Sequence, residues 1–208
     1  MITLFFNPIK DQPLRHEGTK KGDMMSAEPA LKYDFEVGVY RPPSEGGSAS
    51  LLLRLTRNCP WNRCEFCAMY KTEKFELRSP AEVKGDIDQI ADICNNLKDI
   101  SVKLGYGGRI TREAAIELLN SAPELNYQQG FVMVYNWLQS GAKTAFLQDA
   151  NSLIMKTDQL VDILQHLRKT FPTLNRVTSY ARSKTIAQKK LDELKAIREA
   201  GLDRVHIG

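Results

Sequence analysis

Four short apolar segments that indicate strands recur along the chain, and amphipathic segments that indicate helices separate them. The strand segments are residues 50–56, 143–147, 176–180 and 204–207. The first contains an almost continuous run of leucine, which is typical of a strand covered on both faces. Strands that alternate with helices predict a parallel sheet with right-handed crossovers. The sequence therefore predicts an α/β fold whose four strands amount to half of an eight-stranded TIM-type barrel.

Several predicted helix starts carry capping signals. Ser79 is followed by Pro80 at the first helical position and by Glu82 three residues on, a pattern that predicts a capping box. Residues 157–158, Thr-Asp, are predicted to cap the helix that follows the second strand. The apolar residues of the helix after Ser79 share one face: Val83, Ile87, Ile90, Ile93, Cys94 and Leu97. Cys94 is therefore predicted to be a small core residue.

A helical pair is predicted at residues 99–140, inserted between the first and second strands. Thr111 is placed to cap the first helix of this pair, and Pro123 ends it. The second helix is predicted from about residue 124 to residue 139, with Gly141 in position to end it.

Length and composition predict one domain with an appendage. Residues 38–208 are predicted to form the domain, whereas residues 1–37 are predicted to form a flexible N-terminal arm because their polar middle shows no period. The apolar fraction of 42% suffices for a core, and the net charge of +4 is too diffuse to indicate a nucleic-acid partner. No apolar run approaches the roughly 20 residues that span a membrane, and the first residues lack the features of a secretory signal.

Three of the four cysteines lie within nine residues, directly after the first strand segment. Cys59, Cys64 and Cys67 have the spacing Cys-x4-Cys-x2-Cys, so one tight loop can point three thiolates at one centre. Thiolates suit zinc or an iron–sulfur cluster. Clustered cysteines in a chain without a secretory signal indicate metal ligands in a reducing compartment rather than disulfides, and we expect a cytoplasmic protein.

The number of cysteines bears on the kind of centre. A structural zinc site needs four protein ligands. A 4Fe–4S cluster held by three cysteines keeps one iron without a protein ligand, and that iron can bind a small molecule. The trio therefore favours a cluster with an open corner, unless Cys94, His166 or His206 supplies a fourth ligand to zinc.

Several ordered blocks carry a resemblance to a known family. They are residues 41–45, 53–67, 147–151, 177–182 and 199–208. On these blocks the chain from Tyr40 to Gly208 resembles the radical S-adenosylmethionine (SAM) superfamily, and Phe66, the aromatic before the third cysteine, also fits. The commonest spacing there is Cys-x3-Cys-x2-Cys, so this chain has one extra residue in the first gap. Because the superfamily usually has a six-strand partial barrel, the resemblance implies an incomplete barrel. Truncation after the fourth strand is the favoured explanation, and a short gene product or completion of the sheet by another chain are the alternatives.

The resemblance implies an enzyme and its cofactors. Cys59, Cys64 and Cys67 would hold three irons of a 4Fe–4S cluster, and the fourth iron would bind the amino and carboxylate groups of SAM. One-electron reduction by an external donor would cleave SAM to methionine and a 5′-deoxyadenosyl radical, which abstracts hydrogen from a substrate. The cofactors supply this reactivity, while the protein supplies position and excludes water.

Residues at the ends of the second and third strands are candidate SAM contacts, as the resemblance implies. Gln148 and Asp149 stand where the superfamily often has Gly-Gly-Glu, and Asp149 is expected to accept from the SAM ammonium unless it only forms a turn. Ser179 and Tyr180 both carry hydroxyls at the end of the third strand, one of which is expected to reach the ribose, and Ser179 is the predicted contact. Arg182 is expected to pair with the SAM carboxylate, the alternative being a solvated loop charge. Phe66 is expected to border the adenine or, alternatively, to pack in the core.

Two alternatives to a radical SAM enzyme stay open. One is a zinc or iron–sulfur binding module without SAM chemistry, and the other is an inactive fragment, because the predicted barrel is incomplete. The sequence shows no separate RNA-binding domain, which favours a small-molecule or peptide substrate over RNA. The substrate itself is not identified, because specificity in such folds comes from loops and appended domains.

Overall fold

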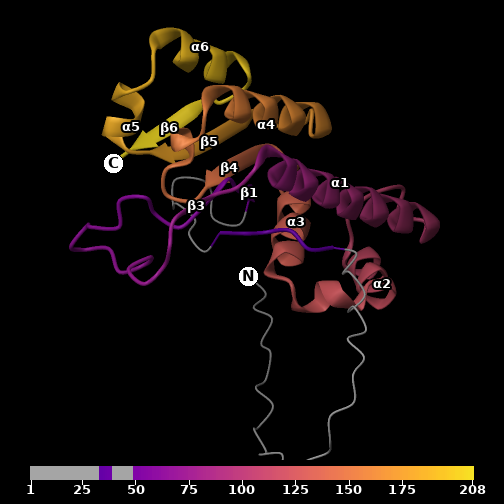
Figure 1. Cartoon of the computed structure of the whole chain (residues 1–208). Coiled ribbons are helices and arrows are strands. Elements are labelled where there is room, and N and C mark those ends of the chain that lie inside the picture. The colour runs from indigo at the N-terminus through magenta and orange to yellow at the C-terminus, as the bar shows by residue number, and fades with distance from the viewer. Residues whose placement is uncertain (1–32, 39–48) are drawn as a thin grey trace, which may run out of the picture. The chain divides into compact units, whose positions relative to one another are not determined.

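The computed structural model describes residues 33–38 and 49–208, which all belong to one compact unit (Figure 1). Most of the predicted N-terminal arm, residues 1–32, lies outside the described residues. None of the described helices is long and apolar enough to cross a membrane.

The described part of the predicted arm packs into the core. Tyr33 and Phe35 are buried and belong to the main hydrophobic cluster, so the core begins before the domain boundary predicted at residue 38. The phenol of Tyr33 accepts from the side-chain amide of Asn96 (2.6 Å). Gly130 makes room for Phe35, because a Cβ added there would lie 2.5 Å from the Phe35 ring.

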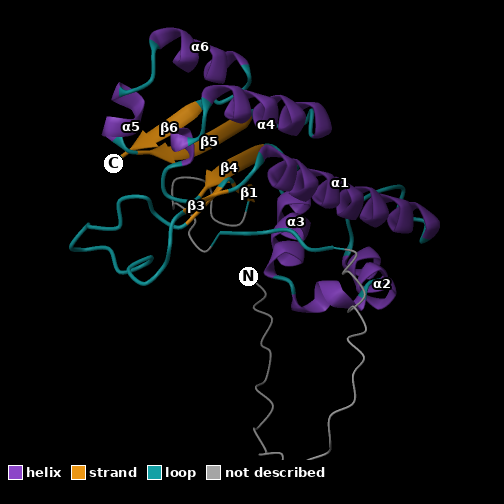
Figure 2. Ribbon diagram, in the orientation of Figure 1, coloured by secondary structure: helices purple, strands orange, loops and turns teal. Residues whose placement is uncertain are grey.

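The four predicted strands form one parallel sheet (Figure 2). They are β1 (Ser50–Arg54), β4 (Thr144–Gln148), β5 (Arg176–Ala181) and β6 (Arg204–Ile207), and they lie side by side in that order. In the register of the sheet, Leu52 of β1 opposes Phe146 of β4, which opposes Thr178 of β5. The prediction of an α/β fold with a parallel sheet is thereby confirmed.

Helices occupy each connection between these strands. Between β1 and β4 lie α1 (Pro80–Lys103), α2 (Arg112–Ser121), a 3-10 helix (Pro123–Tyr127) and α3 (Gln129–Gln139). Between β4 and β5 lie a 3-10 helix (Ser152–Ile154) and α4 (Thr157–Thr170). Between β5 and β6 lie α5 (Ser183–Ala187) and α6 (Leu191–Glu199). Helix α1 contacts both β1 and α4, so it anchors the sheet to the neighbouring helices.

The two faces of the sheet differ in character. On one face the rings of Phe146, Tyr180 and His206 meet across β4, β5 and β6. The ring centroids of Phe146 and Tyr180 are 5.1 Å apart, and those of Tyr180 and His206 are 5.7 Å apart. Successive side chains of a strand point to opposite faces, so Leu147 and Ser179 belong to the other face. That other face includes the fully buried leucines of β1 and β4 and is the apolar one.

Three predicted helix boundaries need correction. Helix α1 continues to Lys103, because its buried face extends beyond residue 99, so the inserted pair begins later than predicted. The second inserted helix is broken at Gln128, whose extended backbone (φ −95°, ψ 116°) separates the 3-10 helix from α3. Thr157 does not cap α4: it is the first helical residue, and its hydroxyl donates to Glu193 Oε1 (2.8 Å).

The capping box at the start of α1 is confirmed. Ser79 Oγ accepts from the backbone N–H of Glu82 (3.3 Å), and Glu82 Oε2 accepts from the backbone N–H of Ser79 (2.8 Å). The predicted apolar face of α1 is also confirmed, because Ile90 is fully buried and Cys94 is buried beside it. The segment between β1 and α1 is therefore fixed at one end by a strand of the sheet and at the other by a capped, buried helix.

Candidate functional site

The clustered cysteines lie on a loop between two short antiparallel strands, β2 (Thr56–Arg57) and β3 (Glu76–Leu77). This pairing, which the sequence pattern does not predict, closes the base of the cysteine loop, residues 58–75. Two asparagines have left-handed backbone conformations, Asn58 with φ 67° and Asn62 with φ 49°. Asparagine tolerates this conformation better than most side chains, which explains its use at both turns.

Polar contacts give the cysteine loop its shape. The backbone N–H of Asn62 donates to Cys59 Sγ (3.4 Å), and that of Cys67 donates to the carbonyl of Cys64 (3.3 Å). Lys71 Nζ donates to the carbonyls of Asn62 (3.2 Å) and Cys64 (2.7 Å), which draws the two halves of the loop together. All three thiols are free and half-buried. The loop is thus folded on itself while its thiols stay accessible.

The candidates for a fourth metal ligand are engaged elsewhere. Cys94 is buried on α1, where burial raises the pKa of its thiol to about 12. His166 Nε2 pairs with Asp88 (2.7 Å), and His206 packs against the ring of Tyr180. Across residues 33–38 and 49–208, no group of three or more His, Cys, Asp or Glu side chains is arranged to hold one metal ion. In the described part of the chain, neither a closed zinc site nor a converging trio of Cys59, Cys64 and Cys67 is therefore preformed.

A cavity of about 590 Å³ lies between the cysteine loop and the carboxyl ends of β4 and β5. Its lining residues are Phe66, Cys67, Ala68, Met69 and Tyr70 from the loop, Phe146, Gln148, Asp149 and Ala150 from β4 and the residues after it, and Tyr180 from β5. Open α/β folds bind ligands at the carboxyl ends of their strands. The cavity therefore combines a thiol, aromatic rings and a carboxylate where this fold class binds ligands.

Asp149 supplies the carboxylate of the cavity wall. Its side chain is fully buried, and its Oδ2 accepts from Arg54 Nε (3.0 Å) and from the backbone N–H of Asn58 (2.7 Å) and lies 2.9 Å from Arg54 Nη2. Its Oδ1 has no hydrogen-bond partner among the described residues. Burial raises the pKa of Asp149, while the hydrogen bonds from Asn58 and Arg54 oppose this rise. The unpaired oxygen is buried, so accepting from a ligand would require that it become exposed to the cavity.

Gly38 lies directly against this part of the cavity wall. Its backbone N–H donates to Gln148 Oε1 (3.0 Å), across a separation of 110 residues in sequence. A Cβ added at Gly38 would lie 2.4 Å from Asp149 Oδ1 and 2.7 Å from Gln148 Oε1. The close approach therefore requires glycine, and residues 33–38 help to bury the Asp149 carboxylate.

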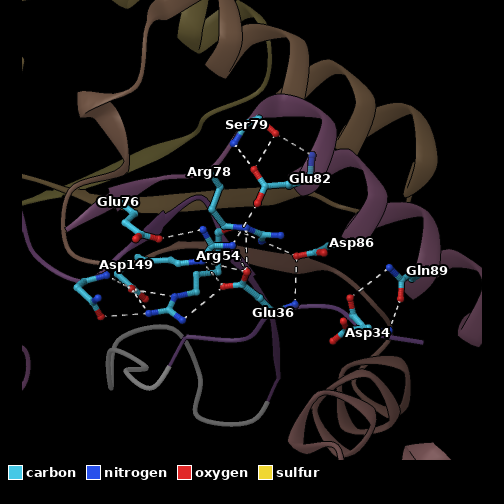
Figure 3. A network of polar contacts seen from close by, with 12 residues as sticks. Asp34, Glu36, Arg54, Glu76, Arg78, Ser79, Glu82, Asp86, Gln89 and Asp149 are labelled. Atoms are coloured by element: carbon cyan, nitrogen blue, oxygen red, sulfur yellow. Dashed lines mark hydrogen bonds and ion pairs between the residues drawn. The ribbon is translucent and has the colours of Figure 1, made fainter. Parts of the chain in front are cut away.

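An ion-pair network connects residues 33–38 with the base of the cysteine loop (Figure 3). Glu36 is its centre: its Oε2 accepts from Arg57 Nε (2.9 Å) and lies 3.5 Å from Arg54 Nη1, and its Oε1 lies 3.4 Å from Arg78 Nε. The hydrogen bond from Arg57 is the main cause that lowers the pKa of Glu36. The base of the loop is therefore held by charge pairs rather than by apolar packing.

Three of the five predicted SAM contacts meet at the cavity: Phe66, Gln148 and Asp149. Phe66 is 94% exposed, which contradicts the alternative of a core residue. Sequence reasoning missed Phe146, although it lies two residues before Gln148 and therefore on the same face of β4. It also missed residues 68–70, for which an irregular loop offers no periodic signal.

The other two predicted contacts lie away from the cavity lining. Ser179 is fully buried, and its hydroxyl donates to the carbonyl of Leu147 (3.2 Å). The next residue, Tyr180, lines the cavity instead, and strand alternation is the signal that selects it. The guanidinium of Arg182 lies 4.3 Å from the ring centroid of Trp61, so it is not simply a solvated charge. This stacking ties the cysteine loop to the end of β5.

No model of a protein family matches this chain, and no curated protein or solved structure matches it. Its function has to be inferred from the chemistry of the site itself. Three half-buried thiols lie on one loop, and Cys67 lines the same cavity as Asp149. Thiolates are common ligands of metal groups and a cavity of this volume suits a small molecule, but the three thiols are not grouped around one point in the structure.

Proposed function

We propose that the cysteine loop holds a 4Fe–4S cluster, that the adjoining cavity binds SAM, and that the protein is a radical SAM enzyme. The single observation that carries the proposal is that Cys67 and Asp149 line the same cavity. The cavity volume of about 590 Å³ is within the range of small-molecule sites. We further propose that the four-stranded sheet is part of a partial (βα) TIM-type barrel, with the cavity at the carboxyl ends of its strands.

The donor set supports a cluster more than a single zinc ion. Cys59, Cys64 and Cys67 supply three thiols on one loop, and thiolates are the usual ligands of iron–sulfur clusters. A closed zinc site would need a fourth donor. Cys94 is buried on α1 and His166 is paired with Asp88, so neither is placed to complete such a site. Three cysteine ligands leave one position of a cluster for the ligand in the cavity.

The cavity also suits the chemical groups of SAM. Asp149 Oδ1 is buried without a partner among the described residues, and it could accept from an ammonium group once it is exposed to the cavity. Phe66, Phe146 and Tyr180 offer aromatic surfaces against which an adenine can pack. Met69 adds an apolar wall that excludes water from the reacting groups.

With the cluster reduced by one electron, the bound cofactors supply a 5′-deoxyadenosyl radical that abstracts hydrogen from a substrate. The residues of this chain hold the cofactors, orient them and keep the cavity dry. We propose that the electron comes from an external donor and that the protein works in the reducing cytoplasm. A small molecule or a peptide is the proposed substrate class, because the cavity has the volume of a small-molecule site.

The proposal is tested by anaerobic reconstitution of the full chain with iron and sulfide, followed by reduction in the presence of SAM and assay of 5′-deoxyadenosine. We expect visible iron–sulfur absorption and product in the wild type, and loss of both in Cys59→Ala, Cys64→Ala and Cys67→Ala. Cys94→Ala is the matched control, because this buried cysteine of α1 is not in the cavity lining. It has to leave both the absorption and the product unchanged.

The other outcomes separate the alternatives. A cluster that depends on the three loop cysteines but yields no 5′-deoxyadenosine would indicate an iron–sulfur module without SAM chemistry, or an inactive fragment. Stoichiometric zinc without visible absorption would overturn the cluster assignment itself. Product that persists in Cys67→Ala would contradict the assignment of the cysteine loop.

A further inference from the structure

Two buried carboxylates belong to the same polar network and serve different parts of the chain. Asp86 and Asp149 are 3% and 4% exposed, and burial raises the pKa of both. Asp86, on α1, pairs with Arg78 (2.5 Å) and accepts from the backbone N–H of Glu36 (3.2 Å). It therefore fastens residues 33–38 to α1. Asp149 instead accepts from the cysteine loop.

Asp149 contacts the cysteine loop at Asn58, the residue that directly precedes the first cysteine. Asp149 Oδ2 accepts from the backbone N–H of Asn58 at 2.7 Å, and Asn58 precedes Cys59. The left-handed backbone of Asn58 needs such support, because its conformation is intrinsically unfavourable. The Asn58 side chain adds two contacts: its Oδ1 accepts from Arg54 Nη2 (3.3 Å), and its Nδ2 donates to the carbonyl of Lys74 (2.7 Å).

Arg54 completes this unit from the end of β1. Its Nε donates to Asp149 Oδ2, and its Nη2 donates to Asn58 Oδ1 and lies 2.9 Å from Asp149 Oδ2. One guanidinium can serve both partners because its donors form a rigid planar fork. The end of β1, the end of β4 and the start of the cysteine loop are thereby joined at one point.

We infer that Asp149 is a positioning residue for the cysteine loop: together with Arg54 it fixes Asn58, and through Asn58 it sets where Cys59 stands relative to the cavity. The consequence for catalysis rests on the proposed function, in which a cluster on the loop must face SAM in the cavity. The role does not depend on contact with SAM, because it is Oδ2 that holds the loop. One carboxylate thus couples the metal-binding loop to the ligand pocket.

The test compares the full-length, metal-free chain with Asp149→Ala, Asp149→Asn and Asp86→Ala. NMR measures hydrogen exchange at the backbone amides of Asn58 and of Asn62, whose N–H donates to Cys59 Sγ. We expect both amides to exchange about tenfold faster in Asp149→Ala, because a hydrogen bond to a charged acceptor is lost. Asp149→Asn keeps an oxygen that can take the place of Oδ2, so it should restore most of the protection. Asp86→Ala loses an equally buried carboxylate and should leave both amides unchanged.

Global destabilisation is separated from loosening of the loop by the amide of Ile90, in the middle of α1. If Asp149→Ala does not fold, Arg54→Lys is the second variant, because a lysine has no planar fork to bridge Asp149 and Asn58. Two results would overturn the inference. One is unchanged exchange at Asn58 in a folded Asp149→Ala or Arg54→Lys chain, and the other is equal acceleration in Asp86→Ala.

A spectroscopic readout connects the inference to the proposed function. In the reconstituted chain without SAM, we expect the EPR spectrum of the reduced cluster to change in Asp149→Ala and to stay as in the wild type in Asp86→Ala. Failure of the wild type to assemble any cluster would refute the proposed function and leave the amide-exchange result standing. A wild-type cluster whose EPR spectrum and amide exchange are both insensitive to Asp149→Ala would refute the positioning role alone.

Discussion

Helix α1 and the cysteine loop are neighbours in sequence and are held in place by different forces. Ile90 of α1 is fully buried, whereas Trp61 and Phe66 of the loop are 42% and 94% exposed. The loop depends on ion pairs at its base and on hydrogen bonds such as those from Lys71. The chain thus fixes its frame, the parallel sheet with α1 and α4, by apolar burial. It holds the cysteine loop mainly by polar contacts, with Tyr70 as a buried side chain of the loop.

The free energies of apolar burial and of hydrogen bonding explain how α1 and the cysteine loop differ in stability. Burying an isoleucine side chain completely contributes about 1.5–3 kcal/mol, whereas a typical hydrogen bond contributes about 1 kcal/mol net. A loop held by a few such bonds can open locally without unfolding the sheet. The cysteine loop is therefore the part of the molecule whose order a bound cluster or ligand can change most.

The difference between α1 and the cysteine loop is tested most directly by removing an apolar side chain from each of them in turn. We expect Ile90→Ala to lower the free energy of unfolding by about 3 kcal/mol, because it leaves a cavity beneath α1. Phe66→Ala should change it by less than about 0.5 kcal/mol, because this ring is exposed. Urea unfolding of the metal-free chain measures both. A Phe66→Ala chain as unstable as Ile90→Ala would mean that the loop packs as a second core.

Much of the frame could be predicted from the sequence because its signals are local. The capping box at Ser79 involves residues three positions apart, and the periodicity that places Cys94 in the core spans a few helical turns. The apolar runs of the four strands are equally local. The break at Gln128 was missed because the apolar pattern on both sides of it fits one continuous helix.

The site could be predicted only in part because its contacts are non-local. Arg54 and Asp149 are 95 residues apart, and no local pattern indicates which arginine meets which carboxylate. Strand position identified the right region of β5, but the side chain at the cavity is Tyr180 rather than Ser179. Neighbouring side chains of a strand point to opposite faces of the sheet, so an error of one residue in position assigns a side chain to the wrong face.

A second test of this difference uses Gly38, where residues 33–38 contact the cavity wall. We expect Gly38→Ala to lower the free energy of unfolding by about 2 kcal/mol, because the added Cβ would lie 2.4 Å from Asp149 Oδ1 and force one of the two segments to move. Gly85→Ala is the matched control: it lies within α1 with no atom in the path of its Cβ, and it should stabilise the chain by about 0.5–1 kcal/mol.

Urea unfolding again measures both glycine variants. A Gly38→Ala chain as stable as the wild type would show that residues 33–38 do not cover Asp149 in solution. In that case the burial that raises the pKa of Asp149 would also be lost, and the carboxylate would be open to solvent from the cavity.

The smallest effect is expected at the capping box, where the two regions join. Glu82 accepts from the backbone of Ser79 (2.8 Å) and also from Arg57 Nη2 (3.2 Å) at the base of the loop. The hydrogen bonds from Ser79 are the main cause that lowers the pKa of Glu82 from 4.5 to about 2. The charged carboxylate therefore stabilises the fold above about pH 4.5, and this contribution is lost as the pH falls through about 2.

We expect Ser79→Ala to lower the free energy of unfolding by about 1 kcal/mol at neutral pH, and this deficit to shrink as the pH falls from about 4.5 towards 2. Thr111→Ala is the matched control, because Thr111 caps α2 by accepting from Ala114 N (3.2 Å) without a carboxylate at the third helical position. Its deficit should stay constant across the same pH range in parallel urea titrations. A deficit at Ser79 that did not vary with pH would show that the Glu82 carboxylate is not coupled to the cap, and the base of the loop would then depend on the Arg57–Glu36 pair.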